Sequence, residues 1–148
     1  MSPGRRSARR QAVFALYRQD LLGRPWQISG QDNSDTLVDD YARELVLGVG
    51  EKHSAIDTVL QPHVAGWSLE RLGTLERAIL RLAAYELLWE PEVPAAVAID
   101  EAVELTKRFC SDEAAALVNG VLGSLWNTER NRIDSIRDPD KPRPERAT

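Results

Sequence analysis

The sequence has 148 residues, of which 43% are hydrophobic and 28% are charged, and its formal net charge is −4. A chain of this length suits one globular domain, which buries roughly 70% of the surface of its unfolded chain and needs no disulfide to hold a core. The single cysteine, Cys110, excludes an internal disulfide and a CxxC zinc site, and no apolar run approaches the roughly 18 residues of a membrane span. These features favour a cytoplasmic protein.

Apolar residues at helical spacing predict an all-α protein, a compact bundle of about six or seven helices. The expected helical segments cover residues 4–22, 34–60, 73–89, 95–109 and 111–136, with a short turn near residues 67–69. The second segment is expected to start at Ser34 or Asp35, either of which can cap it. Gly48 and Gly50 should bend or break it, because glycine weakens a helix interior.

The helices are expected to form one domain over residues 1–136. Ser68 is a plausible cap of the short turn, and Ser111 of the last helix. Residues 137–148 are charged and rich in proline, so they are predicted to be a disordered tail. Because the loops are mostly short, consecutive helices should pack on each other.

Positive charge is concentrated at the N-terminus. The charged side chains between Met1 and Gln19 are all arginines, namely Arg5, Arg6, Arg9, Arg10 and Arg18. On a helix, Arg5 and Arg9 lie one turn apart, and such a like-charged pair costs roughly 0.2–0.5 kcal/mol. A bound polyanion would relieve this repulsion and release counterions. The residues alone leave two interpretations open, an RNA-binding edge and a solvated basic terminus.

Catalytic and metal-binding motifs are absent from the sequence. The two histidines, His53 and His63, belong to no HExxH or Glu-x-x-His motif, and no glycine-rich phosphate loop is present. Cys110 would need a neighbouring histidine to act as a nucleophile. Glu86 lies on a mainly apolar helix, so we expect an arginine or a backbone cap from a neighbouring helix to pair with it. We therefore expect no enzymatic activity, no cofactor and no metal.

Four blocks of sequence, in order and in spacing, resemble the NusB family. They are RRSARRQAVFALY at 5–17, TLERAILRLAAYELLW at 74–89, VAIDEAVELTKRF at 97–109 and LVNGVLGSL at 117–125. The resemblance covers roughly residues 5–126. It implies an all-helical transcription antitermination factor that binds the boxA element of nascent ribosomal RNA transcripts together with the ribosomal protein NusE. The complex would then join other Nus factors on RNA polymerase.

The resemblance also implies two sets of binding residues. The RNA-binding set comprises Arg5, Arg6, Arg9 and Arg10 in the first helix and Lys107, Arg108, Ser111 and Glu113 near the start of the last helix. Tyr17 and Glu76 are expected to face NusE. The acidic remainder of the chain predicts weak RNA binding by the chain alone and stronger binding once a basic partner is present. The resemblance leaves monomer and homodimer open.

Two other functions stay open at this stage. The first is a helical adaptor that binds only proteins, in which the arginines merely solubilise the terminus. The second is the RNA-binding module of an RNA-modifying enzyme, because NusB-like domains also precede ribosomal RNA cytosine methyltransferase domains. The short charged segment after residue 136 leads us to expect no such enzyme domain here.

Overall fold

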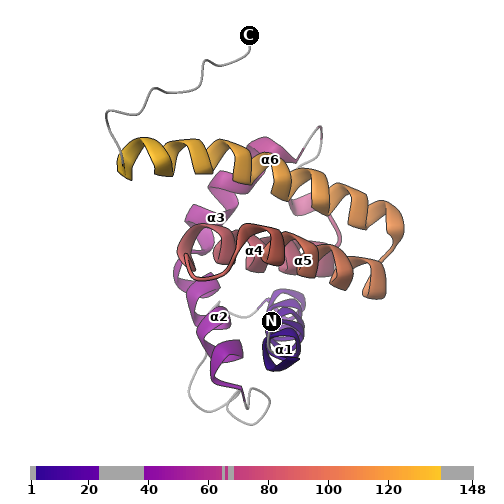
Figure 1. The fold of residues 1–148 in the computed structure, drawn as a ribbon. Coiled ribbons are helices and arrows are strands. Elements are labelled where there is room, and N and C mark those ends of the chain that lie inside the picture. The colour runs from indigo at the N-terminus through magenta and orange to yellow at the C-terminus, as the bar shows by residue number, and fades with distance from the viewer. Residues whose placement is uncertain (1–2, 24–38, 65, 67–68, 138–148) are drawn as a thin grey trace.

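The computed structural model describes residues 3–23, 39–64, 66 and 69–137, and within these ranges every regular element is a helix. The elements are α1 (Pro3–Leu21), α2 (Asp40–Glu51), α3 (His53–Leu60), the 3₁₀ turns η1 (Gln61–His63) and η2 (Leu69–Arg71), α4 (Thr74–Trp89), α5 (Ala95–Phe109) and α6 (Asp112–Arg137) (Figure 1). The expected all-helical bundle is confirmed.

Helix α4 forms the centre of the bundle and packs against α1, α2, α3, α5 and α6. All ten of its residues from Ala78 to Leu87 are buried. A helix covered on every side must be apolar all round, and small residues such as Ala83 and Ala84 let its neighbours approach closely. Two charged residues, Arg81 and Glu86, lie within this buried stretch and therefore need partners.

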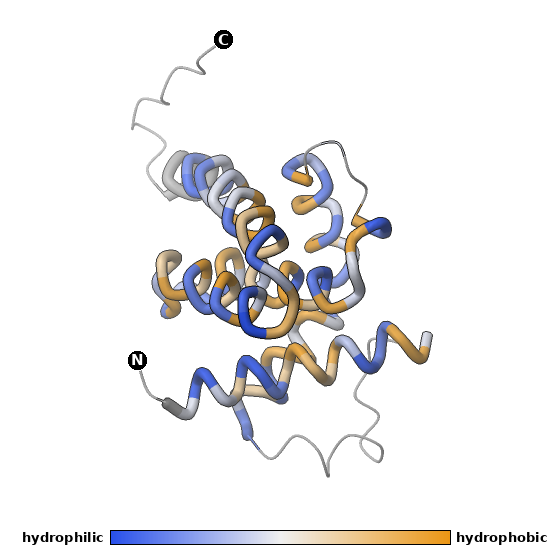
Figure 2. The backbone as a smooth tube through the Cα atoms, turned by 90° about the vertical axis from the view of Figure 1, so that its right-hand side faces the viewer, coloured by the Kyte–Doolittle hydropathy of each residue, from blue (hydrophilic) through white to orange (hydrophobic). Residues whose placement is uncertain are grey.

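Helix α1 packs on α2 and α4 along one side. Its buried stripe includes Ala8, Ala12, Val13 and Leu16, each at most 1% exposed. Hydrophilic residues dominate the first turns of α1 and hydrophobic residues its middle, as the tube in Figure 2 shows. The same helix thus anchors in the core and presents polar side chains near its start.

The helix boundaries mostly follow the predicted signals. Helix α2 begins at Asp40, where the Asp39 carboxylate accepts hydrogen bonds from the backbone N–H of Tyr41 and Ala42 at 2.8 and 3.2 Å. The expected caps Ser34 and Asp35 lie outside the described residues. The helical segment breaks at Lys52, between α2 and α3, whereas Gly48 and Gly50, where the break was expected, lie within α2.

Close helix packing explains one glycine of α2. A Cβ at Gly48 would overlap the ring of Tyr85, so glycine is what lets α2 lie against α4 at this point. At the start of α6, the expected cap is confirmed, because Ser111 Oγ accepts a hydrogen bond from the N–H of Ala114 at 3.0 Å. Helix α6 continues to Arg137, one residue into the predicted tail.

The remaining predictions about the ends lie beyond the described ranges. Residues 138–148, which make up nearly all of the expected tail, and Ser68, the expected cap of η2, fall outside them. The single domain over residues 1–136 stays a prediction. Within the described part of the chain, no helix combines the length and the apolar character that crossing a membrane requires.

Candidate nucleic-acid interface

The four arginines at the start of α1 do not share one environment. Arg6 and Arg9 have acidic partners within the fold, Arg5 lies on an aromatic ring, and Arg10 faces a surface groove. Successive residues of a helix point about 100° apart, so a run of arginines necessarily divides among its faces. The four arginines therefore have different roles in the structure.

Arg9 lies in the core. It is 1% exposed, and its Nε donates to both carboxylate oxygens of Glu86, at 2.8 and 2.9 Å. The hydroxyl of Tyr41 donates to the same carboxylate at 2.7 Å. Burial alone would lower the pKa of Arg9, but the hydrogen bond and the charge of Glu86 raise it overall. Arg9 therefore joins α1 to α4 and does not face solvent, which corrects its expected place on an RNA-binding surface.

The same contacts confirm the prediction made for Glu86. This carboxylate is 1% exposed on the central helix, and a neighbouring helix supplies the arginine that the sequence led us to expect. Burial and the hydrogen bond to Glu86 raise the pKa of Tyr41 well above its ordinary value. The phenol therefore stays protonated and continues to donate to the carboxylate at physiological pH.

Arg5 and Arg6 flank this buried cluster. The Arg5 guanidinium lies 4.5 Å from the centre of the Tyr41 ring, a cation–π arrangement that leaves the residue partly exposed. Arg6 Nε forms an ion pair with Glu101 Oε1 at 2.9 Å, while 71% of the Arg6 side chain remains accessible. Arg6 is thus the more accessible of the two for an anionic ligand, although Glu101 offsets part of its charge.

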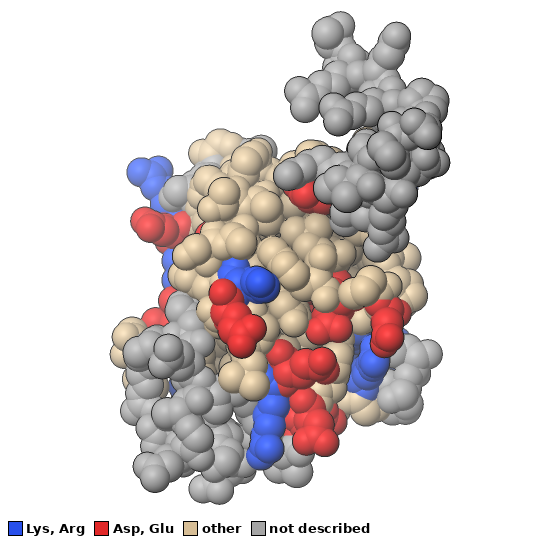
Figure 3. Space-filling view, turned by 90° about the vertical axis from the view of Figure 1, so that its left-hand side faces the viewer, with Lys and Arg blue, Asp and Glu red and all other residues tan. Residues whose placement is uncertain are grey.

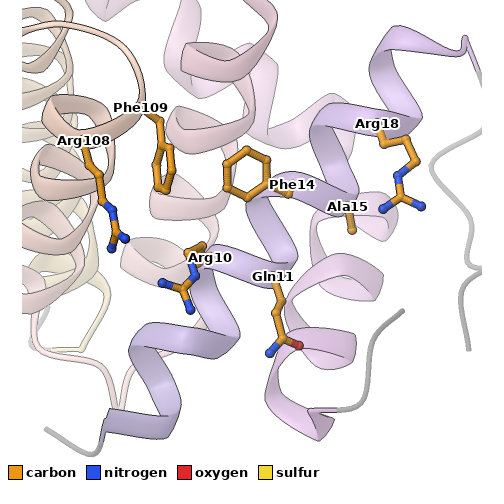
Figure 4. Close-up of a pocket in the computed structure, with 7 residues that line it drawn as sticks. All are labelled: Arg10, Gln11, Phe14, Ala15, Arg18, Arg108 and Phe109. Atoms are coloured by element: carbon orange, nitrogen blue, oxygen red, sulfur yellow. The ribbon is translucent and has the colours of Figure 1, made fainter. Parts of the chain in front are cut away.

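Arg10 and Arg108 face a common groove between α1 and the end of α5. The groove has a volume of about 410 Å³ and is lined by Arg10, Gln11, Phe14, Ala15, Arg18, Arg108 and Phe109. In the close-up of Figure 4, the rings of Phe14 and Phe109 lie side by side, edge to face, with Arg108 beside Phe109 and Arg18 on the far side of Phe14. The groove brings together two predicted residues, Arg10 and Arg108, with aromatic and basic residues that were not predicted.

The other predicted residues of the RNA-binding set lie around the junction of α5 and α6. Lys107 occupies the last turn of α5, and Ser111 and Glu113 lie at the start of α6, all three exposed. The Ser111 hydroxyl is engaged as the helix cap. All three lie within five residues of Arg108 in the sequence, at the short connection between α5 and α6.

Tyr17 and Glu76, the predicted protein-binding pair, are both half-buried on neighbouring helices. The Tyr17 ring meets Phe14 edge to face with centres 6.4 Å apart, so Tyr17 contacts a residue that lines the groove. Burial, together with the charge and hydrogen bond of Glu76, raises the pKa of the Cys110 thiol to about 11. Glu76 and the end of α5 are therefore close neighbours.

Phe14, Arg18 and Phe109 also line the groove, and none of the three is in the predicted binding set. A signal for the first two was present, because Arg10, Phe14 and Arg18 follow each other at intervals of four and share one side of a helix. Phe109 could not be placed beside them from sequence, since it is far along the chain and its position depends on how α5 crosses α1.

Acidic side chains dominate a different part of the surface. They gather, with a few basic side chains between them, on the face shown in Figure 3, the side on which α2 lies in Figure 1. Elsewhere in the fold, burial and the carboxylates of Glu90, Glu44 and Glu51 raise the pKa of Tyr85 to about 12. In the described residues, no cluster of three or more histidine, cysteine or acidic side chains could hold a metal ion.

Comparisons with known proteins agree on one family. The model of the NusB family matches residues 6–127. The transcription antitermination protein NusB of Saccharopolyspora erythraea is 46% identical over 126 residues, which cover 82% of this chain and 85% of that protein.

Solved structures give the same result. The structure of T. maritima NusB has a TM-score of 0.72 and 32% identity, covering 86% of this chain and 93% of that one. A crystal structure of the antitermination factors NusB and NusE in complex with double-stranded RNA also has a TM-score of 0.72, with 29% identity and coverage of 86% and 99%.

Proposed function

The chain belongs to the NusB family, and on that basis we propose that it is a transcription antitermination factor that binds boxA RNA of nascent ribosomal RNA transcripts together with NusE. The family match, which covers residues 6–127, is the observation that carries this proposal. The solved NusB and NusE complex with RNA supports the choice of both ligands. The role would be one of binding rather than catalysis, and it implies a cytoplasmic location, where transcript and polymerase meet.

The proposed RNA surface runs from the first turns of α1 to the junction of α5 and α6. It consists of Arg5, Arg6, Arg10, Lys107, Arg108, Ser111 and Glu113. Arg9 is left out, because its guanidinium is buried against Glu86. The arginines would supply charge-assisted hydrogen bonds to phosphate, which position a strand without reading its sequence. Base recognition would then depend on the α5–α6 junction and on the partner.

The proposed NusE surface centres on Tyr17 and Glu76. One helical turn beyond Tyr17, Leu21 is 57% exposed, so α1 adds an accessible apolar side chain to the half-buried ring. Aromatic and apolar anchors beside a charged rim are typical of protein interfaces. NusE would in turn connect the chain to other Nus factors and to RNA polymerase.

The proposal is tested by titrating labelled boxA RNA with the chain alone, with NusE alone and with both, using fluorescence anisotropy. We expect weak binding by the chain alone, because its net charge is −4, and much tighter binding when NusE is present. Equal affinity with and without NusE would contradict joint binding. Absence of any RNA binding by the complex, with NusE still bound, would favour the protein-binding adaptor.

A salt titration tests the arginines directly. Each phosphate contact contributes about −0.7 to the slope of log affinity against log salt for a single strand, so Arg6→Ala should flatten the slope by about that amount. Arg130→Ala is the matched control, because Arg130 is exposed on α6 about 28 Å along the helix from Ser111. An unchanged slope for Arg6→Ala would show that Arg6 does not contact phosphate.

A further inference from the structure

The groove between α1 and α5 combines three guanidinium groups with two aromatic rings. We propose that this groove seats a nucleotide of a single RNA strand, with its base stacked on Phe109 and its flanking phosphates held by Arg10, Arg18 and Arg108. The inference rests on the proposed function, and it extends the RNA surface to Phe14, Arg18 and Phe109.

The charge of the groove selects an anionic occupant. No acidic residue is among those that line it. Within the described part of the chain, Arg10, Arg18 and Arg108 form no ion pair, in contrast to Arg6 and Arg9. Three arginines with no acidic partner around one hollow repel each other, and a phosphate backbone relieves that repulsion while it releases counterions.

The aromatic rings favour a nucleotide over an acidic peptide. Phe109 is 37% exposed, and the edge-to-face contact with Phe14, with centres 5.0 Å apart and planes at 87°, holds its ring in place. The Arg108 guanidinium lies 5.2 Å from the centre of the same ring. A fixed, accessible ring with guanidinium groups around it is the arrangement on which unpaired bases stack in single-strand binding proteins.

The dimensions also fit a nucleotide in an extended strand. The volume of about 410 Å³ lies within the range of roughly 300–1,000 Å³ that is common for sites of small ligands. Arg10 and Arg18 are eight residues apart on α1, about 12 Å along the helix, with Phe14 midway between them. One base can therefore lie in the middle of the groove while its backbone passes both arginines. A duplex cannot bind in this way, because its bases are already stacked.

The test uses the full chain in complex with NusE and single-stranded boxA RNA that carries 2-aminopurine at one position at a time. In the wild-type complex, one position should show a fluorescence change caused by stacking on Phe109. Phe109→Ala should abolish that change and weaken RNA affinity at least about fivefold, the effect of losing one aromatic stack. Phe109→Trp should retain both, and Arg18→Gln should reduce the salt slope by about 0.7.

The controls separate this inference from the proposed function. Arg130→Gln should behave as wild type, and circular dichroism should show that all variants are folded. Suppose that Phe109→Ala and Arg18→Gln keep the wild-type RNA affinity and salt slope, while Arg6→Ala still reduces the salt slope. This result would overturn nucleotide binding in the groove and leave the proposed function standing. If Phe109→Ala and Arg18→Gln weaken NusE binding in the absence of RNA, while the 2-aminopurine signal and the salt slope stay as in wild type, the groove binds protein. That result would also overturn the inference. No RNA binding by the wild-type complex would overturn both.

Discussion

Replacing Arg9 with alanine should destabilise the fold and leave the phosphate contacts intact. The Arg9 and Glu86 side chains are 2% and 1% exposed, and the carboxylate accepts two hydrogen bonds from Arg9 Nε at 2.8 and 2.9 Å. Removing one member of a buried ion pair costs about 3–5 kcal/mol, because the remaining charge stays buried. Tyr41 would still donate to Glu86, so we expect a loss of about 3 kcal/mol, at the low end of that range. In a protein of this size each kcal/mol lowers the melting temperature by about 2–4 °C, which gives a decrease of about 6–12 °C.

Thermal unfolding followed by circular dichroism measures the loss of stability in Arg9→Ala. A salt titration with boxA RNA and NusE, at a temperature where the variant is folded, measures its phosphate contacts. The double variant Arg9→Met/Glu86→Leu removes both charges and should recover much of the stability, since apolar side chains of similar volume often replace buried ion pairs without cost. A normal melting temperature together with a salt slope reduced by about 0.7 would refute the structural role and return Arg9 to the RNA surface.

Three further predictions concern single side chains. Tyr41→Phe should lower the free energy of unfolding in urea by about 1.5–3 kcal/mol, because it removes a hydrogen bond to a charged group; an unchanged midpoint would contradict this. Since burial and Glu76 raise the pKa of Cys110 to about 11, alkylation by iodoacetamide should be slow at pH 8 and accelerate toward pH 11, and Glu76→Gln should shift that profile to lower pH. The folded state favours the protonated thiol, so this part of the free energy of unfolding is fully present below the unfolded pKa of 9.0. It is lost as the pH rises through about 11. Glu101→Gln should raise RNA affinity up to about fivefold at 0.1 M salt, because it releases Arg6 from its ion pair. The gain in affinity should vanish near 1 M salt, where the Debye length is about 3 Å. Weaker RNA binding by this variant would show that Glu101 holds Arg6 in place.

Local signals were sufficient to predict most helices. Helix α4 begins directly after Gly73 and α5 directly after Pro94, as expected from residues that favour a helix start or prevent its continuation. The start of α2 was placed too early, because the preceding stretch offers several capping residues of equal quality. The structure identifies Asp39 as the cap, because its backbone is extended, with φ −85° and ψ 128°, and its carboxylate accepts from the first N–H groups of α2.

The role of Arg9 was predictable from the sequence in principle. Ala12, Val13 and Leu16 lie three, four and seven positions after it, the spacing of one buried helix face. A buried arginine requires a buried acid, and Glu86 was already identified as a carboxylate in need of a partner. What the sequence lacks is the pairing itself, because the two residues are 77 positions apart and meet only when α1 packs on α4.

A net charge of −4 does not exclude RNA binding, and the structure gives the reason. Counterion release depends on the cations that contact phosphate, and a charge that is neutralised inside the fold takes no part in it. The Arg9–Glu86 pair is buried and cancels, whereas Arg10, Arg18 and Arg108 have no ion-pair partner among the described residues. The acidic side chains gather on another face, which would repel a transcript and attract a basic ribosomal protein (Figure 3). An acidic protein can therefore present a basic groove, because Arg10, Arg18 and Arg108 line it and no acidic residue does.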